Sequence, residues 1–171
     1  IPASGTTTPI TGNLTNTTNT PQTTTFTITA EFNGCSTTIN TITITVNPKP
    51  TLAALPLTQT VCGSVPFANI AITNPNSVLG TTFGWTRNNT VNVTGVTSFG
   101  SGSSISGTLT NTTNSNQTVT FTIAALAGSC PSDAMTVDVV VLPTPLITVT
   151  PSSQTRCHLQ AITTLNFGNS N

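Results

Sequence analysis

ISGTLTNTTNSNQTVTFTI, residues 105–123, closely repeats ITGNLTNTTNTPQTTTFTI, residues 10–28. The offset between the copies stays constant beyond them, since Cys130 follows Cys35 by 130 − 35 = 95 positions. The same offset relates, without a gap, Gly12 to Gly107, Phe26 to Phe121 and Cys62 to Cys157. Self-similarity at a fixed period is the signature of repeat architectures. The chain is therefore predicted to be a segment of a tandem array in which one module of about 95 residues is repeated.

Two Pro-x-Pro segments mark the module boundaries. NPKP (47–50) and LPTP (142–145) stand at equivalent positions of the repeat. Proline fixes φ and removes a hydrogen-bond donor, so each segment ends a strand and stiffens a short linker. We predict a complete module at 51–145, the C-terminal half of a preceding module at 1–50, and the N-terminal part of the next at 146–171. Neither end fragment buries a full core alone, so we expect the polypeptide to continue in both directions; a duplication with truncated ends would expose apolar edges.

Composition excludes several classes of partner. The 171 residues include only three Lys and Arg and three Asp and Glu, which is 4% charged, whereas soluble domains are about one quarter charged. Nucleic-acid binding needs a basic footprint on phosphates, and anionic membranes attract basic patches. We therefore expect no nucleic-acid partner. No apolar run is long enough to span a bilayer, so we also expect no membrane insertion of these residues.

Strict alternation predicts antiparallel strands. In QTTTFTITA (22–30), Phe26 and Ile28 share a face, and in TITITV (41–46) isoleucine alternates with threonine. Period-two patterning is typical of a strand with one buried face, and Glu31–Gly34 between the runs is a turn signal. Threonine, about a quarter of the residues, suits a pleated, half-exposed surface, and helix-forming residues are scarce. The sequence therefore predicts an all-β chain.

The complete module repeats this hairpin and adds earlier strands. About seven short strands separated by turns favour an immunoglobulin-like antiparallel β-sandwich. We predict that Trp85, Phe121, Ile123, Val137 and Val139 lie in its core. Trp85 has an alternative interpretation as an exposed platform for stacking carbohydrate, although a lone aromatic residue on an alternating strand usually packs inside.

The four cysteines allow three pairings. The favoured pairing joins Cys62 to Cys130 within one module and leaves Cys35 and Cys157 to partners outside this sequence. A second pairing, Cys35–Cys62 and Cys130–Cys157, would span a strand, a linker and a strand, which places the sulfurs tens of ångströms apart at ~3.3 Å per residue. A third joins the early cysteine of one module to the late cysteine of the next. The favoured pairing has a difficulty, because parallel first and last strands would separate its cysteines unless Pro56 kinks the chain.

Residues for catalysis or metal binding are few. His158 is the only histidine, and the acids are Glu31, Asp133 and Asp138. These do not form repeated triads, a calcium cage or a pair of glycosidase carboxylates, and no CxxC motif is present. We therefore expect no enzyme activity, no cofactor and no metal. Six asparagines match N-x-[ST], a weak signal in so Thr- and Asn-rich a chain: Asn13, Asn16, Asn88, Asn92, Asn111 and Asn116.

The repeated sequence motifs resemble those of a known family. NLTNTTNTPQTTTFTIT, its copy TLTNTTNSNQTVTFTIA, FGWTRNNTVNVTG, the Gly-Cys or Gly-Ser-Cys before the last strand, and VNPKP resemble the PKD-like repeats of giant surface adhesins in Bacteroidota. Some of those adhesins are mobile in gliding motility. The resemblance implies tandem immunoglobulin-like domains, export by the type IX system and a role in gripping surfaces. It supplies no catalytic residues.

The leading hypothesis is structural. We expect an extracellular or cell-surface stalk or filament that acts in adhesion or gliding, in keeping with cysteines that pair in an oxidising compartment. Its expected partners are neighbouring modules, other copies in a filament, and surface polysaccharide or another cell surface. The alternatives are a glycan-binding module that uses Trp85, and a spacer of a large secreted enzyme.

Overall fold

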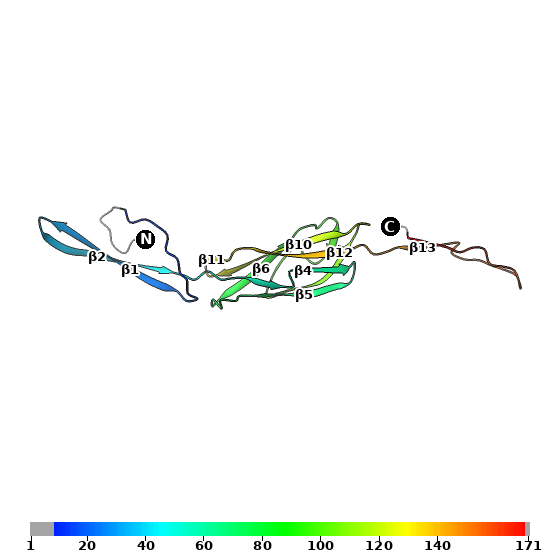
Figure 1. The fold of residues 1–171 in the computed structure, drawn as a ribbon, viewed down its shortest axis with the longest axis horizontal. Helices are drawn as coiled ribbons and strands as arrows, with labels where there is room; N and C mark the ends of the chain where they lie inside the picture. Colours follow the sequence, from blue (N-terminus) through cyan, green and yellow to red (C-terminus); the bar gives the residue numbers. More distant parts are fainter. Residues whose placement is uncertain (1–8, 170–171) are drawn as a thin grey trace.

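The structure, a computed structural model, describes residues 9–169, apart from the side chain of Ile39. Every regular element in this range is a β-strand. Figure 1 shows a long molecule with a two-stranded hairpin, a central sandwich and a second small hairpin in a row. The predicted all-β, immunoglobulin-like class is confirmed.

The central sandwich consists of two sheets. The first sheet contains, in order, β4 (Thr58–Cys62), β12 (Met135–Leu142), β10 (Gln117–Ala127), β6 (Thr81–Arg87) and β8 (Phe99–Ser101), with β11 (Cys130–Pro131) paired to β10. The second contains, in order, β3 (Ala53–Leu55), β5 (Pro66–Thr73), β9 (Ser104–Asn111) and β7 (Val93–Gly95).

The first strand of the module is divided between the sheets. β3 pairs antiparallel with β5, and after Pro56, which follows a cis peptide bond, the chain continues as β4 in the other sheet. β4 then runs parallel to the last strand, β12, with Thr58 opposite Asp138 and Cys62 opposite Leu142. The first and last strands of the module are therefore direct neighbours.

The core fills the space between the two sheets. Alternate residues of β10 and β12 point inward, and Phe121, Ile123, Val137 and Val139 are fully buried. Phe121 lies at the centre, with its ring 5.6 Å from Trp85 in an edge-to-face contact and 5.9 Å from Phe67. Such aromatic pairs stabilise beyond the area they bury. The buried hydrophobic cluster lies entirely within the predicted complete module, between Ala54 and Val141.

The N-terminal hairpin is a displaced copy of part of this sandwich. β1 (Gln22–Phe32) pairs with β2 (Cys35–Val46). The register Phe26–Ile42 reproduces Phe121–Val137 of β10 and β12 at the repeat offset. Residues 10–16, the counterpart of β9, form no strand. The reason is physical: β9 is held by β5 and β7, and the described preceding half-module has no such strands.

The C-terminal hairpin copies the pairing of β3 with β5. β13 (Ile147–Thr150) pairs with β14 (Asn166–Asn169), and Thr148 opposite Gly168 reproduces Ala53 opposite Thr73 at the same offset. Residues 153–157, the counterpart of β4, form no strand because no copy of β12 lies beside them. The two fragments thus retain the local pairings of the module and lack the long-range ones. The boundaries at 50/51 and 145/146 stay predictions.

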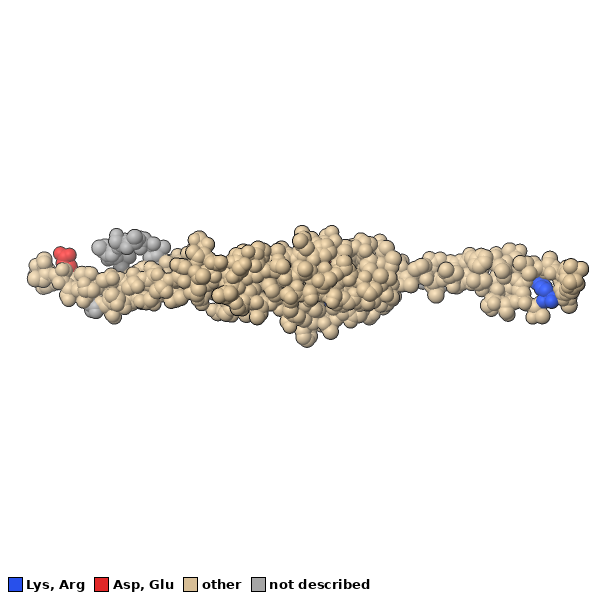
Figure 2. Space-filling view, turned by 90° about the horizontal axis from the view of Figure 1, so that it is seen from below, with Lys and Arg blue, Asp and Glu red and all other residues tan. Residues whose placement is uncertain are grey.

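The surface is almost uncharged. In the view of Figure 2, charged side chains appear only near the two ends of the molecule, and the central sandwich shows none. Lys49 and Asp133 form an exposed ion pair at 2.6 Å.

Candidate functional site at the module junction

The linker between the first hairpin and the sandwich is docked on the sandwich. Pro48 and Pro50 are buried, and Lys49 Nζ bonds to Asp133 Oδ1. Asn76 holds both sides of this segment: its Nδ2 donates to Lys49 O at 2.9 Å, and its Oδ1 accepts from Thr51 N at 2.9 Å. A Pro-rich linker clamped in this way sets the direction in which one module follows another. Sequence reasoning identified the prolines but missed Asn76, for which the sequence holds no signal.

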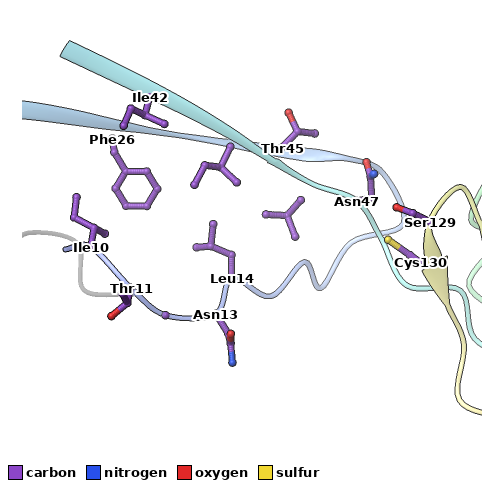
Figure 3. A pocket seen from close by; sticks show the side chains of 13 residues that line it. Ile10, Thr11, Asn13, Leu14, Phe26, Ile42, Thr45, Asn47, Ser129 and Cys130 are labelled. Carbon is purple, nitrogen blue, oxygen red and sulfur yellow. The ribbon is translucent and has the colours of Figure 1, made fainter.

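A groove of about 720 Å³ lies beside this linker (Figure 3). One side is the apolar face of the N-terminal hairpin, the other is the segment of residues 10–14, and Ser129 and Cys130 of the sandwich lie at one end. Its lining includes Ile10, Leu14, Phe26, Ile42, Ile44, Val46, Asn47, Ser129 and Cys130.

The groove is an incomplete core. Ile10 is 54% exposed, whereas its counterpart Ile105 is 1% exposed. Ile42 is 46% exposed, whereas its counterpart Val137 is fully buried. The apolar residues that line the groove are counterparts of residues that face the space between the two sheets in the complete module. The groove therefore has the chemistry of one half of a sandwich core.

The repeated Asn-Thr-Thr-Asn motif ties a turn to the last strand. Asn111 is buried, and its Nδ2 donates to Ser115 O at 2.7 Å and to Val141 O at 2.9 Å. Its Oδ1 accepts from the backbone N and the hydroxyl of Thr113, both at 2.8 Å. The copy repeats every bond, since Asn16 contacts Thr18, Thr20 and Val46 in the same way. Because all its polar atoms are engaged inside the protein, Asn111 is not available as a glycan acceptor. From the sequence, Asn111 was identified only as a weak match to N-x-[ST].

The cysteines lie at opposite ends of the sandwich. Cys62 stands opposite Leu142, where β12 ends, and Cys130 pairs with Ala127 beyond the start of that strand. The eight residues of β12 span roughly 23 Å at ~3.3 Å per residue, and a disulfide needs Cα atoms within about 7 Å. All four cysteines are free. The predicted Cys62–Cys130 disulfide is therefore corrected: the break at Pro56 moves the strand between sheets and does not bring Cys62 to the other end.

Comparison with known proteins identifies the fold family. The family model described as "PKD-like domain" matches residues 2–50 and 59–145. This chain belongs to the PKD-like domain family. No curated protein sequence matches it.

Among solved structures, domains 4 and 5 of the S-layer protein SbsC match this PKD-like chain at 17% sequence identity and a TM-score of 0.33. The match covers 63% of this chain and 63% of that one, so it spans less than two thirds of either. In residues 9–169, the structure contains no helix long and apolar enough to cross a bilayer.

Arg87 is a structural cation of the PKD-like module. Its side chain is buried beside β7, where Nε donates to Val96 O at 2.7 Å and Nη1 donates to Val93 O at 3.1 Å. Burial away from water lowers the pKa of Arg87 below its usual value. The guanidinium stays charged at neutral pH and satisfies main-chain carbonyls that would otherwise lack donors. A single Arg before a turn gave no sequence signal for this role.

Trp85, predicted in the core, is half-buried: its ring packs against the core of the PKD-like module, and Gly100 lies against the ring. It lies on β6 opposite Gly100 of β8, and a Cβ at Gly100 would overlap its ring. Its indole N–H is buried and has no hydrogen-bond partner among the described residues. A flat, open face for sugar stacking is therefore absent at Trp85.

The remaining polar candidates do not converge. Asp138 accepts a hydrogen bond from Thr120 Oγ1 at 2.7 Å, and Asp133 pairs with Lys49. Glu31 and His158 are exposed on the two end fragments. Within the described range, no three His, Cys, Asp or Glu side chains group as metal ligands.

Proposed function

We propose that this chain is a load-bearing segment of an extracellular array of PKD-like modules, which acts as the stalk or fibre of a cell-surface adhesin. One observation carries the proposal: the first and last strands of the module, β4 and β12, run parallel and adjacent. The docked linker at residues 47–50 supports it, because it holds successive modules end to end.

The strand arrangement suits a pulled molecule. The chain enters the sandwich at one end and leaves it at the other (Figure 1). Tension applied through the two linkers pulls β4 and β12 in opposite directions along their length. Hydrogen bonds between strands lie across this direction, so they must break together, whereas a hairpin pulled from one end breaks them singly. Asp138 N donates to Leu57 O and Gly63 N to Leu142 O at the two ends of this contact.

The wider role rests on family resemblance and surface chemistry. Membership of the PKD-like family and the resemblance to adhesin repeats of Bacteroidota favour a secreted surface protein of the gliding-adhesin type, exported by the type IX system. The surface, almost without charge, is suited to lateral contact with other copies, since few charges oppose the pairing of strand edges. Its partners would be neighbouring modules, other copies and surface polysaccharide. In this proposal the segment has no enzyme activity of its own.

A matched pair of proline variants tests the mechanical role. Gly63 N–H points toward β12, and N–H directions alternate along a strand, so Val61 N–H points the same way and Thr60 N–H points away. β4 is an edge strand, where proline is tolerated on the free side. In single-molecule pulling of the full chain, Val61→Pro should clearly lower the unfolding force of the complete module, and Thr60→Pro should lower it little. Equal forces for Val61→Pro and the unmodified chain would refute the shear arrangement.

The adhesin role has a separate test. An antibody against residues 51–145 should label intact cells that make the native polypeptide, and electron micrographs should show a fibre that shortens when one module is deleted. Antigen that is found only after lysis, or a compact particle of unchanged size, would contradict the proposal.

A further inference from the structure

Both cysteines of the complete module lie where it meets its neighbours. Cys130 is at the end where residues 47–50 enter, and half-exposed there, and Cys62 is exposed at the end where residues 142–145 leave. Cys35 lies in the same way at the far tip of the N-terminal hairpin, opposite Phe32. The late cysteine of each module thus lies at the end next to the preceding module. The early cysteine lies at the end next to the following module.

The strand register indicates where a cysteine of a preceding module would lie relative to Cys130. In the complete module, Cys62 of β4 stands opposite Leu142. The last strand of the preceding half-module, β2, keeps the pairing of β12 at the repeat offset, since Gln22–Val46 reproduces Gln117–Val141. The counterpart of Leu142 is Asn47 (142 − 95 = 47). A copy of β4 beside β2 therefore brings its cysteine opposite Asn47.

Asn47 and Cys130 lie toward the same end of the groove. Both line the groove at the junction, and Figure 3 shows the side chains of Asn47, Ser129 and Cys130 side by side. Neighbouring strands lie about 4.8 Å apart, so a cysteine opposite Asn47 would lie at the end of the groove that Cys130 lines. A disulfide between them needs Cα atoms about 4.4–6.8 Å apart.

We propose that a disulfide closes each junction, joining the early cysteine of one module to the late cysteine of the next. Cys130 then bonds to the preceding counterpart of Cys62, and Cys62 bonds to the following counterpart of Cys130. The bond forms by thiol–disulfide exchange with an external small-molecule disulfide. One cysteine thiolate attacks it and releases a first thiolate, and the second cysteine thiolate attacks the mixed disulfide and releases another. The two cysteines lose two electrons and two protons, and the external disulfide is reduced to two thiols.

The pairings within this sequence do not satisfy the geometry. Cys62 and Cys130 are separated by the length of β12. Cys35 is separated from the junction by the length of β2, whose twelve residues span about 36 Å at ~3.3 Å per residue. The junction disulfide rests on the tandem array proposed above, but not on adhesion.

The test restores the preceding module in front of the intact chain. Residue 1 is the counterpart of residue 96 (1 + 95 = 96), so residues 51–95 are placed directly before it, which adds a second copy of Cys62. Two variants make the copies distinguishable: Cys62→Ser in the native copy only, and Cys62→Ser in the added copy only. Each polypeptide is refolded with reduced and oxidised glutathione, its free thiols are alkylated, and its peptides are mapped by mass spectrometry without reduction.

The expected results differ between the two variants. With the native Cys62 replaced, Cys130 should be found linked to the added cysteine and protected from alkylation. With the added copy replaced, Cys130 should be alkylated. The variant Cys35→Ser, at the far hairpin tip, is the matched control and should leave the link intact. Alkylation of Cys130 in both variants, or its linkage to native Cys62, would overturn the proposal.

Hydrogen exchange separates this failure from failure of the array. If the added residues complete the preceding module, amides of β2 should exchange more slowly than in the unextended chain, because the free edge of β2 gains a β4-like partner. Slower exchange with an alkylated Cys130 refutes the disulfide alone. Unchanged exchange refutes the tandem array, and the disulfide with it.

Discussion

Replacement of Asn111 by alanine should strongly destabilise the complete module. Asn111 makes four hydrogen bonds, and the bond to Val141 O is buried. The partners in the turn, Thr113 and Ser115, are near solvent, so water replaces much of what they lose. Each of the four bonds contributes about 1 kcal/mol, and only the partners near solvent recover part of that loss. We expect a loss of about 3 kcal/mol in the free energy of unfolding.

The assay is urea unfolding of the full chain, followed by the fluorescence of Trp85. Because Trp85 is the only tryptophan and packs against the core of the complete module, the signal reports on that module. At an m-value of about 2 kcal/mol/M, the midpoint should fall by about 1.5 M. The control is Asn116→Ala, an exposed residue of the same connection, which should shift the midpoint little. If Asn111→Ala and Asn116→Ala behave alike, the motif does not tie the turn to β12.

Asn111→Asp distinguishes the donor bonds from the acceptor bonds. Aspartate keeps an oxygen for Thr113 but presents a second oxygen, in place of Nδ2, to the carbonyls of Ser115 and Val141. At neutral pH this variant should be less stable than Asn111→Ala. Burial against carbonyls raises the folded-state pKa of the new carboxyl above the unfolded value of about 3.9. Its relative stability is therefore greatest at low pH and is lost as the pH rises through the folded-state pKa. A deficit that is independent of pH would show that the carboxylate escapes to solvent.

Three further variants test other contacts by the same unfolding assay. Gly100→Ala should cost about 1–3 kcal/mol because its methyl group overlaps the Trp85 ring, and a shifted Trp85 emission spectrum should accompany the loss; an unchanged midpoint would mean that β8 moves freely. Arg87→Met should cost about 3 kcal/mol, since buried carbonyls lose charged donors, and a loss below about 1 kcal/mol would show that water replaces them. Lys49→Met should change stability by less than about 1 kcal/mol, because its ion pair with Asp133 is exposed, and a larger loss would show that the ion pair holds the linker.

The repeat and the alternation were enough to predict the hairpin of β1 and β2 and its copy in β10 and β12. The constant offset required β1 and β2 to copy β10 and β12, and the period-two pattern placed Phe121 and Val137 on the buried face. These inferences succeeded because they depend on local patterns and on comparison within one chain. A parallel order of the first and last strands was not predicted, but it was named as the condition that would make Cys62–Cys130 difficult, and the structure has that order.

Contacts between distant side chains could not be predicted in this way. Nothing near Arg87 in the sequence shows that it turns inward, because its carbonyl partners are backbone groups that any residues would supply. The clamp by Asn76 depends on where a loop falls in space. Asn111 is an intermediate case, since its exact copy at Asn16 was visible, but a repeated asparagine in a chain rich in asparagine did not reveal which copies are buried.

The buried prolines of the linker have a consequence for the shape of a long assembly. In the proposed array, residues 47–50 are seated on the sandwich, and each unit would therefore fix the rotation of the preceding unit about the common axis. When the same rotation recurs at every step, the units follow a screw symmetry, and any given side chain traces a spiral of constant pitch. Two such fibres could then pack against each other along their whole length only if they had the same helical pitch.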